Sequence, residues 1–232
     1  MKIGGLQKHS LIDYPGKISC VLFLAGCNFD CPYCHNPQLT GTPEERPATI
    51  AVEDALVFLG QRRGWLEGVV VSGGEPTLHA DLPDLCRRIK DLGYAVKLDT
   101  NGSRPEMLRT LLAAGLVDYL AMDIKTEPER YAADVARSCD RSALLASLQI
   151  IMDSGVPYEF RTPCARPLVP PTVIEHIARM IGGSRLYVLQ AFRGDRVLHP
   201  GYFEGVEPTY SSEEMERLRR IAAPWVAECT VR

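Results

Sequence analysis

Short apolar runs alternate with helical segments along most of this chain, which has 232 residues. The first run, residues 18–25, is continuously apolar between Gly16 and Gly26, as is typical of a strand buried on both faces. Strands that alternate with helices of about ten to fifteen residues pair in parallel through right-handed crossovers. We therefore expect strands at 18–25, 68–72, 95–99, 117–124, 158–161 and 186–190, and helices at 49–60, 82–92, 105–114, 142–154, 171–181 and 211–222.

These strand–helix units number about six, which is fewer than the eight of a complete barrel. Residues 226–231 are a candidate for one further strand after the last helix, so the C-terminal helix and strand would span 211–231. Hydrophobic residues make up 46% of the chain, and no segment of disordered composition divides it. We expect residues 1–232 to form a single α/β domain.

The charge and the apolar segments argue against two classes of partner. The formal net charge is −3, whereas sequence-independent nucleic-acid binding requires a basic surface. The first residues lack the charged-then-apolar order of a secretory signal, and no apolar run is long enough to span a bilayer. We expect a soluble cytoplasmic protein that binds neither nucleic acid nor membrane.

Three of the 8 cysteines stand in one loop directly after the first expected strand. This loop, residues 26–36, places Cys27, Cys31 and Cys34 in a C-x3-C-x2-C arrangement. In a reducing cytosol, cysteines are metal ligands or buried thiols rather than disulfides. The remaining cysteines are scattered singly and are expected to be small core residues: Cys20, Cys86, Cys139, Cys164 and Cys229.

Thiolates this close in sequence can surround one polynuclear metal centre. Cubane iron–sulfur clusters usually take four cysteine ligands, so three nearby thiolates without a fourth leave one iron open to an external ligand. An alternative is a tetrahedral zinc site that adds His35 to the three cysteines. That set is less favoured because the adjacent Cys34 and His35 would chelate one ion awkwardly. A single nucleophilic thiol is less favoured again, since it would not require two cysteine neighbours.

The cysteine loop resembles the signature of the radical S-adenosylmethionine (SAM) superfamily, including the aromatic Tyr33 directly before the last ligand. The resemblance implies a [4Fe–4S] cluster on Cys27, Cys31 and Cys34, with SAM bound at the open iron. It also implies an oxidoreductase that cleaves SAM reductively to a 5′-deoxyadenosyl radical.

A second segment, residues 72–76, reads SGGEP after the second expected strand and resembles the GGE motif of the same superfamily. Gly73 and Gly74 would let the backbone approach a ligand closely. Glu75 would accept a hydrogen bond from the ammonium group of SAM. The alternative is an ordinary turn at the end of a strand.

Two further segments, LDTNG at 98–102 and AMDIK at 121–125, resemble segments of the glycyl-radical activating enzymes. In that group, carboxylates and a threonine hold a monovalent cation near SAM, and hard oxygen ligands suit such a cation. Two buried acids on neighbouring strands need a cation or a lysine to neutralise them, so the alternative is a salt bridge with Lys125. The matching oxygens belong to Asp99, Thr100 and Asp123.

Other polar residues at the ends of expected strands are candidates for contacts with SAM. Asn101 and Lys125 lie in the two segments just described. Arg161 could bind the carboxylate or the ribose of SAM, and Gln190 could contact the adenine side. Cys164 departs from the family pattern, and it could either touch the site or only pack in the core.

The opening residues 5–16, together with CHNPQL at 34–39, resemble the short activating proteins of anaerobic ribonucleoside-triphosphate reductase. The resemblance implies a partial (β/α)6 TIM-like barrel. It also implies an electron from a flavodoxin or ferredoxin, and a glycyl radical installed on a partner reductase. Two alternatives stay open: a radical enzyme that acts on a small molecule, and a non-catalytic zinc or iron–sulfur module.

Overall fold

The computed structural model describes residues 1–40, 49–136, 139–194 and 197–232. Its strands form one sheet in the order β1 to β8, in which β1 is antiparallel to β2 and all later neighbours are parallel. The strands are β1 Ile3–Ser10, β2 Ser19–Leu24, β3 Gly68–Gly73, β4 Ala95–Thr100, β5 Tyr119–Asp123, β6 Tyr158–Cys164, β7 Tyr187–Ala191 and β8 Cys229–Val231.

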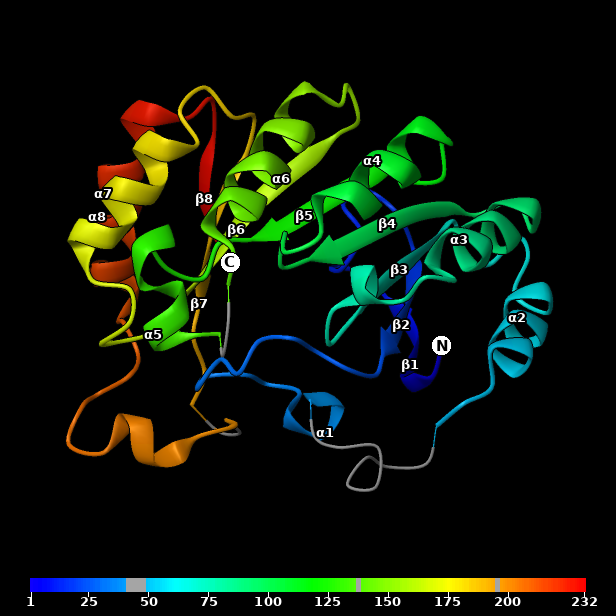
Figure 1. Ribbon diagram of the computed structural model, residues 1–232, viewed down its shortest axis with the longest axis horizontal. Coiled ribbons are helices and arrows are strands. Elements are labelled where there is room, and N and C mark those ends of the chain that lie inside the picture. The colour runs from blue at the N-terminus through cyan, green and yellow to red at the C-terminus, as the bar shows by residue number, and fades with distance from the viewer. Residues whose placement is uncertain (41–48, 137–138, 195–196) are drawn as a thin grey trace.

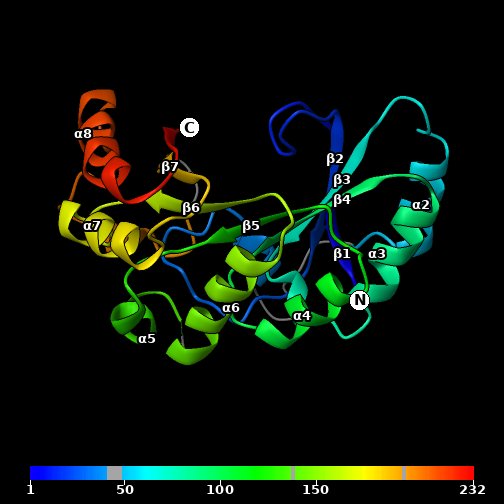
Figure 2. The same cartoon turned by 90° about the horizontal axis from the view of Figure 1, so that it is seen from above.

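The long helices follow the outer side of this curved sheet, whereas the loop between β1 and β2 lies on the inner side (Figures 1 and 2). The helices are α1 Pro37–Thr40, α2 Val52–Gly60, α3 Leu82–Asp91, α4 Pro105–Ala113, α5 Tyr131–Asp134, α6 Arg141–Asp153, α7 Pro171–Met180 and α8 Ser212–Ala222. Short 3₁₀ turns occur at Pro76–Leu78, Pro128–Arg130, Pro200–Phe203 and Ala223–Trp225. None of the helices in the described ranges is long and apolar enough to cross a bilayer.

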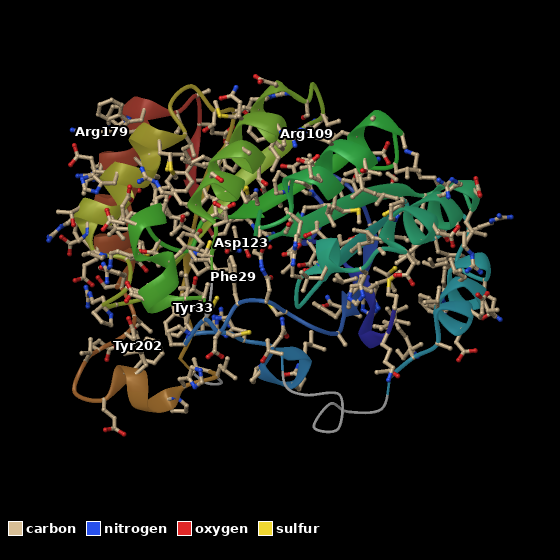
Figure 3. All side chains as sticks on the ribbon, in the orientation of Figure 1. Phe29, Tyr33, Arg109, Asp123, Arg179 and Tyr202 are labelled. Carbon is tan, nitrogen blue, oxygen red and sulfur yellow. The ribbon has the colours of Figure 1, made fainter. Side chains whose placement is uncertain are left out.

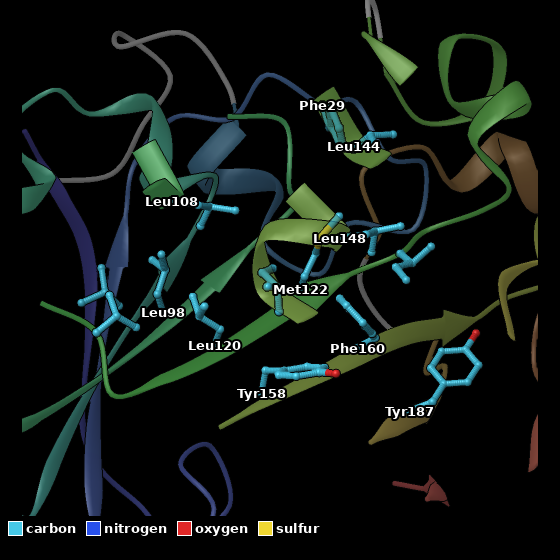
Figure 4. Packing of buried hydrophobic residues seen from close by; sticks show 14 of the residues in the cluster. Phe29, Leu98, Leu108, Leu120, Met122, Leu144, Leu148, Tyr158, Phe160 and Tyr187 are labelled. Atoms are coloured by element: carbon cyan, nitrogen blue, oxygen red, sulfur yellow. The ribbon is translucent and has the colours of Figure 1, made fainter. Parts of the chain in front are cut away.

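Side chains alternate between the two faces of the sheet, and the faces differ in chemistry. On the outer face, Leu98, Met122 and Phe160 are buried in the main core. They pack toward the helices that carry Leu108 and Leu148 (Figure 4). At one end of the inner face, Tyr14, Val21 and Val70 form a small second apolar cluster. The other end of this face is charged and faces the site.

The six expected strand–helix units and the candidate C-terminal strand are confirmed. The edge strand β1 was not predicted, because its sequence IGGLQKHS combines glycines with polar residues, of which Gln7, Lys8 and His9 are exposed. The short helices α1 and α5 were not predicted either. In α8, Ser211 caps the first turn in a capping box with Glu214.

The end of β3 packs directly on the start of the cysteine loop. Gly74 N–H donates to the Leu24 carbonyl at 2.8 Å, and Glu75 N–H donates to the Gly26 carbonyl at 2.7 Å. Gly73 has a φ of +123°, and a Cβ added at Gly74 would lie 2.0 Å from the Gly26 oxygen. The two glycines therefore allow contact with the chain itself, in addition to any ligand.

We expect Gly74→Ala to lower the free energy of unfolding by about 2–3 kcal/mol, because backbone atoms cannot yield to the new methyl group. The matched control is Gly60→Ala in α2, where a Cβ meets nothing within 4 Å and a change below about 1 kcal/mol is expected. Urea unfolding measures both variants. Equal stability of the two would show that the β3–loop contact is not tight.

Candidate active site

The carboxyl ends of the parallel strands and the cysteine loop enclose a cavity of about 410 Å³. This volume is typical of sites for small molecules and cofactors. Every residue that the sequence placed in the site lines this cavity, and so do several that it did not, among them Asp13, Phe29 and Pro163. Figure 3 shows Phe29, Tyr33 and Asp123 near one another at the centre of the molecule. The lining residues predicted from the sequence are Cys27, Cys31, Tyr33, Cys34, Gly73, Gly74, Glu75, Asp99, Thr100, Asn101, Asp123, Lys125, Arg161 and Gln190.

The three cysteines of the loop line the cavity, and no other cysteine of the described residues is among its lining residues. Cys31 is buried and its thiol donates to the Val135 carbonyl at 3.7 Å, while the sulfur of Cys27 accepts the Phe29 N–H at 3.4 Å. Cys164 is fully buried and does not line the cavity; its thiol donates to the Thr162 carbonyl at 3.5 Å. Cys164 therefore packs in the core. Three thiols that line one cavity fit a cluster with one iron left for an external ligand.

Burial raises the pKa of the Cys27 thiol to about 11 and that of the Cys31 thiol to about 12. Both thiols therefore carry protons at neutral pH before metal binds, and metal binding must release them. Within the described part of the chain, no three His, Cys, Asp or Glu side chains form a group that could hold a single metal ion.

Tyr33 brings an unpaired polar atom to the cavity. Its side chain is buried, and its hydroxyl has no hydrogen-bond partner among the described residues. The ring packs edge-on against Phe192, and Lys125 Nζ lies 5.9 Å from its centre. A buried hydroxyl without a partner favours a ligand or a water molecule at this position.

Glu75 joins the ends of β3 and β4 through four hydrogen bonds. Its Oε1 accepts from Thr77 N–H at 3.0 Å, from the Thr77 hydroxyl at 2.5 Å and from the Thr100 hydroxyl at 2.8 Å. Its Oε2 accepts from Asn101 N–H at 2.6 Å. Burial raises the pKa of Glu75, although these donors act to lower it. The carboxyl is therefore already well bonded within the protein, and Oε2 has the smaller number of partners.

Asn101 extends this connection to the cysteine loop. Its side-chain amide donates to Asn28 Oδ1 at 3.0 Å, and the Asn28 amide donates to the Ser103 hydroxyl at 3.0 Å. Two amides and a hydroxyl thus fix the loop against the end of β4. Sequence reasoning assigned Asn101 to the site but did not identify Asn28 as its partner, because the two residues are far apart in the chain.

A chain of ion pairs crosses the inner face of β4, β5 and β6. Lys97 Nζ lies 2.5 Å from Asp99 Oδ1, and Arg161 Nη1 lies 3.3 Å from Asp99 Oδ2. Arg161 Nε donates to Asp123 Oδ1 at 2.7 Å, and Lys125 Nζ lies 3.3 Å from Asp123 Oδ2. The sequence predicted all of these residues except Lys97. Lys97 could have been found from the sequence, because it stands two residues before Asp99 and the two side chains must therefore share one face of the strand.

The protonation of the two acids follows from this arrangement. Burial acts to raise the pKa of Asp123, but Arg161 and Lys125 outweigh it and lower the pKa to about 2. For Asp99, Arg161 and Lys97 likewise outweigh burial and lower the pKa. Both carboxylates are therefore ionised at neutral pH.

A family model supports this reading of the site: the model described as Radical SAM superfamily matches residues 21–182. The chain belongs to the radical SAM superfamily. As a member, it is an enzyme whose cofactors are a [4Fe–4S] cluster and SAM. The lining fits both groups, because three cysteines and several polar side chains of the described residues share one cavity.

One relative extends over almost the whole chain. A protein of Methanocaldococcus jannaschii, provisionally named a glycyl-radical enzyme activating enzyme, is 31% identical over 235 residues, which cover 99% of this chain and 95% of the relative. A Halobacterium salinarum protein, provisionally named a GTP 3′,8-cyclase, is 28% identical over 172 residues, or 71% of this chain and 47% of that one.

Among solved structures, QueE from Escherichia coli is similar with a TM-score of 0.60 at 16% identity, covering all of this chain and 93% of QueE. This likeness supports the fold, a partial barrel of the radical SAM type.

We expect Glu75→Gln to lower the free energy of unfolding by roughly 1–3 kcal/mol. Both oxygens of Glu75 accept a backbone N–H, so in either orientation of the glutamine amide its NH₂ group would face a hydrogen-bond donor. The matched control is Glu67→Gln. Glu67 also accepts a backbone N–H, from Ile18 at 2.9 Å, but is exposed, so a change within about 0.5 kcal/mol is expected. Thermal and urea unfolding measure both. A Glu75 variant as stable as its control would contradict the connecting role of this carboxyl.

Proposed function

We propose that this radical SAM enzyme installs a glycyl radical on a partner protein, with an anaerobic ribonucleoside-triphosphate reductase as the first candidate. The observation that carries the proposal is the glycyl-radical activating relative, which matches at 31% identity over nearly the full length of both chains. The LDTNG and AMDIK segments and the opening residues, whose sequences resemble that group, support it.

The residues of the site would have different roles in such an enzyme. Cys27, Cys31 and Cys34 would hold the [4Fe–4S] cluster. When bound, this cluster would supply the one-electron reduction of SAM to methionine and a 5′-deoxyadenosyl radical, with a reduced flavodoxin or ferredoxin as the electron source. The radical would then take a hydrogen atom from a glycine Cα of the partner. Phe29 and Tyr33 line the cavity beside the thiols and would exclude water from the reacting groups.

The polar residues of the cavity would position SAM. Glu75 Oε2, with its single partner, would accept a hydrogen bond from the SAM ammonium group. Asn101, Lys125 and Arg161 would face its carboxylate and ribose. Gln190, at the end of β7, would lie on the adenine side. In this arrangement SAM enters along the carboxyl ends of the strands, where parallel α/β folds bind ligands.

A second candidate function is radical chemistry on a small molecule. The similarity to a protein named as a GTP cyclase favours it, but that match covers 47% of the relative. The two candidates differ in where the hydrogen atom comes from, so one experiment separates them.

The cluster assignment predicts that anaerobic reconstitution gives a brown protein with about four irons per chain. Cys31→Ala should lose the colour and the formation of 5′-deoxyadenosine from SAM under reductant. Cys86→Ala, which removes a buried thiol of α3 away from the cavity, should retain both. Iron analysis and chromatography of the reaction mixture measure the outcome. Continued production of 5′-deoxyadenosine by Cys31→Ala would exclude this ligand set.

The partner is tested by anaerobic incubation of the reconstituted enzyme with SAM, reduced flavodoxin or ferredoxin, and an anaerobic ribonucleotide reductase. Electron paramagnetic resonance should record a glycyl doublet, and a reductase whose radical glycine is replaced by alanine should give none. If 5′-deoxyadenosine forms without a doublet for any glycyl-radical protein supplied, the small-molecule candidate is favoured instead.

A further inference from the structure

Lys97 has no part in the function proposed so far, yet it is one of the most deeply buried charges in the described residues. Its side chain is 1% exposed on the inner face of β4. Its Nζ lies 2.5 Å from Asp99 Oδ1 and 5.8 Å from the centre of the Tyr119 ring. Burying an ammonium group costs free energy unless a carboxylate and a ring face compensate for it. Lys97 is therefore placed to act on Asp99.

The oxygens expected to hold a monovalent cation are already bonded to protein groups. Both oxygens of Asp99 and both oxygens of Asp123 lie within ion-pair distance of a cationic side chain. The Thr100 hydroxyl donates to Glu75 and accepts the Gly102 N–H at 3.1 Å. A metal ion at this position would have to displace these partners.

The charge balance also disfavours an added cation. Besides Lys97 and Lys125, Arg161 contacts both acids, and its guanidinium lies 3.9 Å from a third buried carboxylate, Glu159. Arg232 in turn pairs with Glu159 at 2.8 Å. Repulsion between a metal ion and these cations would be strong at such short range, because buried charges are weakly screened.

We propose that Lys97 is a built-in cation of the site, which lets the enzyme bind SAM without a monovalent metal ion. Lys97 is a positioning residue: it holds Asp99, and through Arg161 and Asp123 it holds Lys125 beside Tyr33 and the cysteine loop. The proposal decides between the two ways of neutralising these acids that the sequence left open. It rests on the assignment of the cavity to SAM, which follows from the family.

The first test needs no variant. SAM affinity is measured by equilibrium dialysis on the reconstituted enzyme at constant ionic strength, with sodium, potassium or choline as the cation. We expect the dissociation constant to be the same in all three salts within about twofold. Sodium-23 relaxation of the protein before reconstitution should show no saturable site. A several-fold preference for sodium or potassium, or a saturable sodium signal, would overturn the proposal.

The second test removes the charge of Lys97 and asks whether a metal ion from solution can replace it. In choline, Lys97→Met should weaken SAM binding by roughly tenfold, as is typical of coupled groups, and sodium or potassium should restore much of the loss. Lys97→Arg, which keeps the charge, should stay insensitive to the salt. The control Lys90→Met removes a partly exposed lysine that pairs with Asp118 at 2.7 Å and should leave SAM affinity unchanged in every salt.

A Lys97→Met variant that binds SAM normally in choline would show that Lys97 has no positioning role. If that variant does not fold, the proposal is still tested by the salt dependence of SAM binding in the wild-type enzyme and in Lys97→Arg, because neither measurement requires Lys97→Met. If the wild-type enzyme binds no SAM in any salt, the assignment of the cavity fails. The sodium-23 measurement would then still report whether a cation site exists.

Discussion

Charge neutralisation on the inner face of the sheet is the constraint on which the rest of this structure depends. Asp99 and Asp123 end neighbouring parallel strands and are ionised at neutral pH, so each needs a positive partner at close range. Arg161 provides one for both acids from β6. The ion pairs thus connect β4, β5 and β6 across the concave side of the sheet, and they leave polar groups directed at the cavity.

The same strands serve two purposes because side chains alternate along them. In β4, Leu98 faces the helices while Lys97 and Asp99 face inward. The outer residues supply the apolar area that stabilises the fold, and the inner residues supply the site. A shift of one residue in register would exchange the two sets. The packing that holds the strands in register therefore also positions the catalytic cavity.

The sequence was sufficient for the parallel units and for most of the residues that line the cavity, because buried strands and the motifs at their ends are local patterns. It was insufficient for β1, whose edge position and polar residues give no continuous apolar signal. It was also insufficient for what the lining residues bond to. From the sequence we expected Glu75 to be free to accept a hydrogen bond from a ligand. In the structure, its carboxylate already accepts four hydrogen bonds from residues at the ends of two strands. The sequence also does not distinguish Lys97 from an ordinary strand residue, because its contacts with Asp99 and Tyr119 are visible only in the structure.

Two networks reach the cysteine loop from different sides of the cavity. Glu75 and Asn101 approach it from the ends of β3 and β4 and end at Asn28. The ion pairs approach it from the inner face and end at Lys125 beside Tyr33. A loop held on both sides loses little conformational freedom when metal binds. Because burial keeps the thiols of Cys27 and Cys31 protonated until metal binds, these polar networks contribute to the order of the loop independently of the metal.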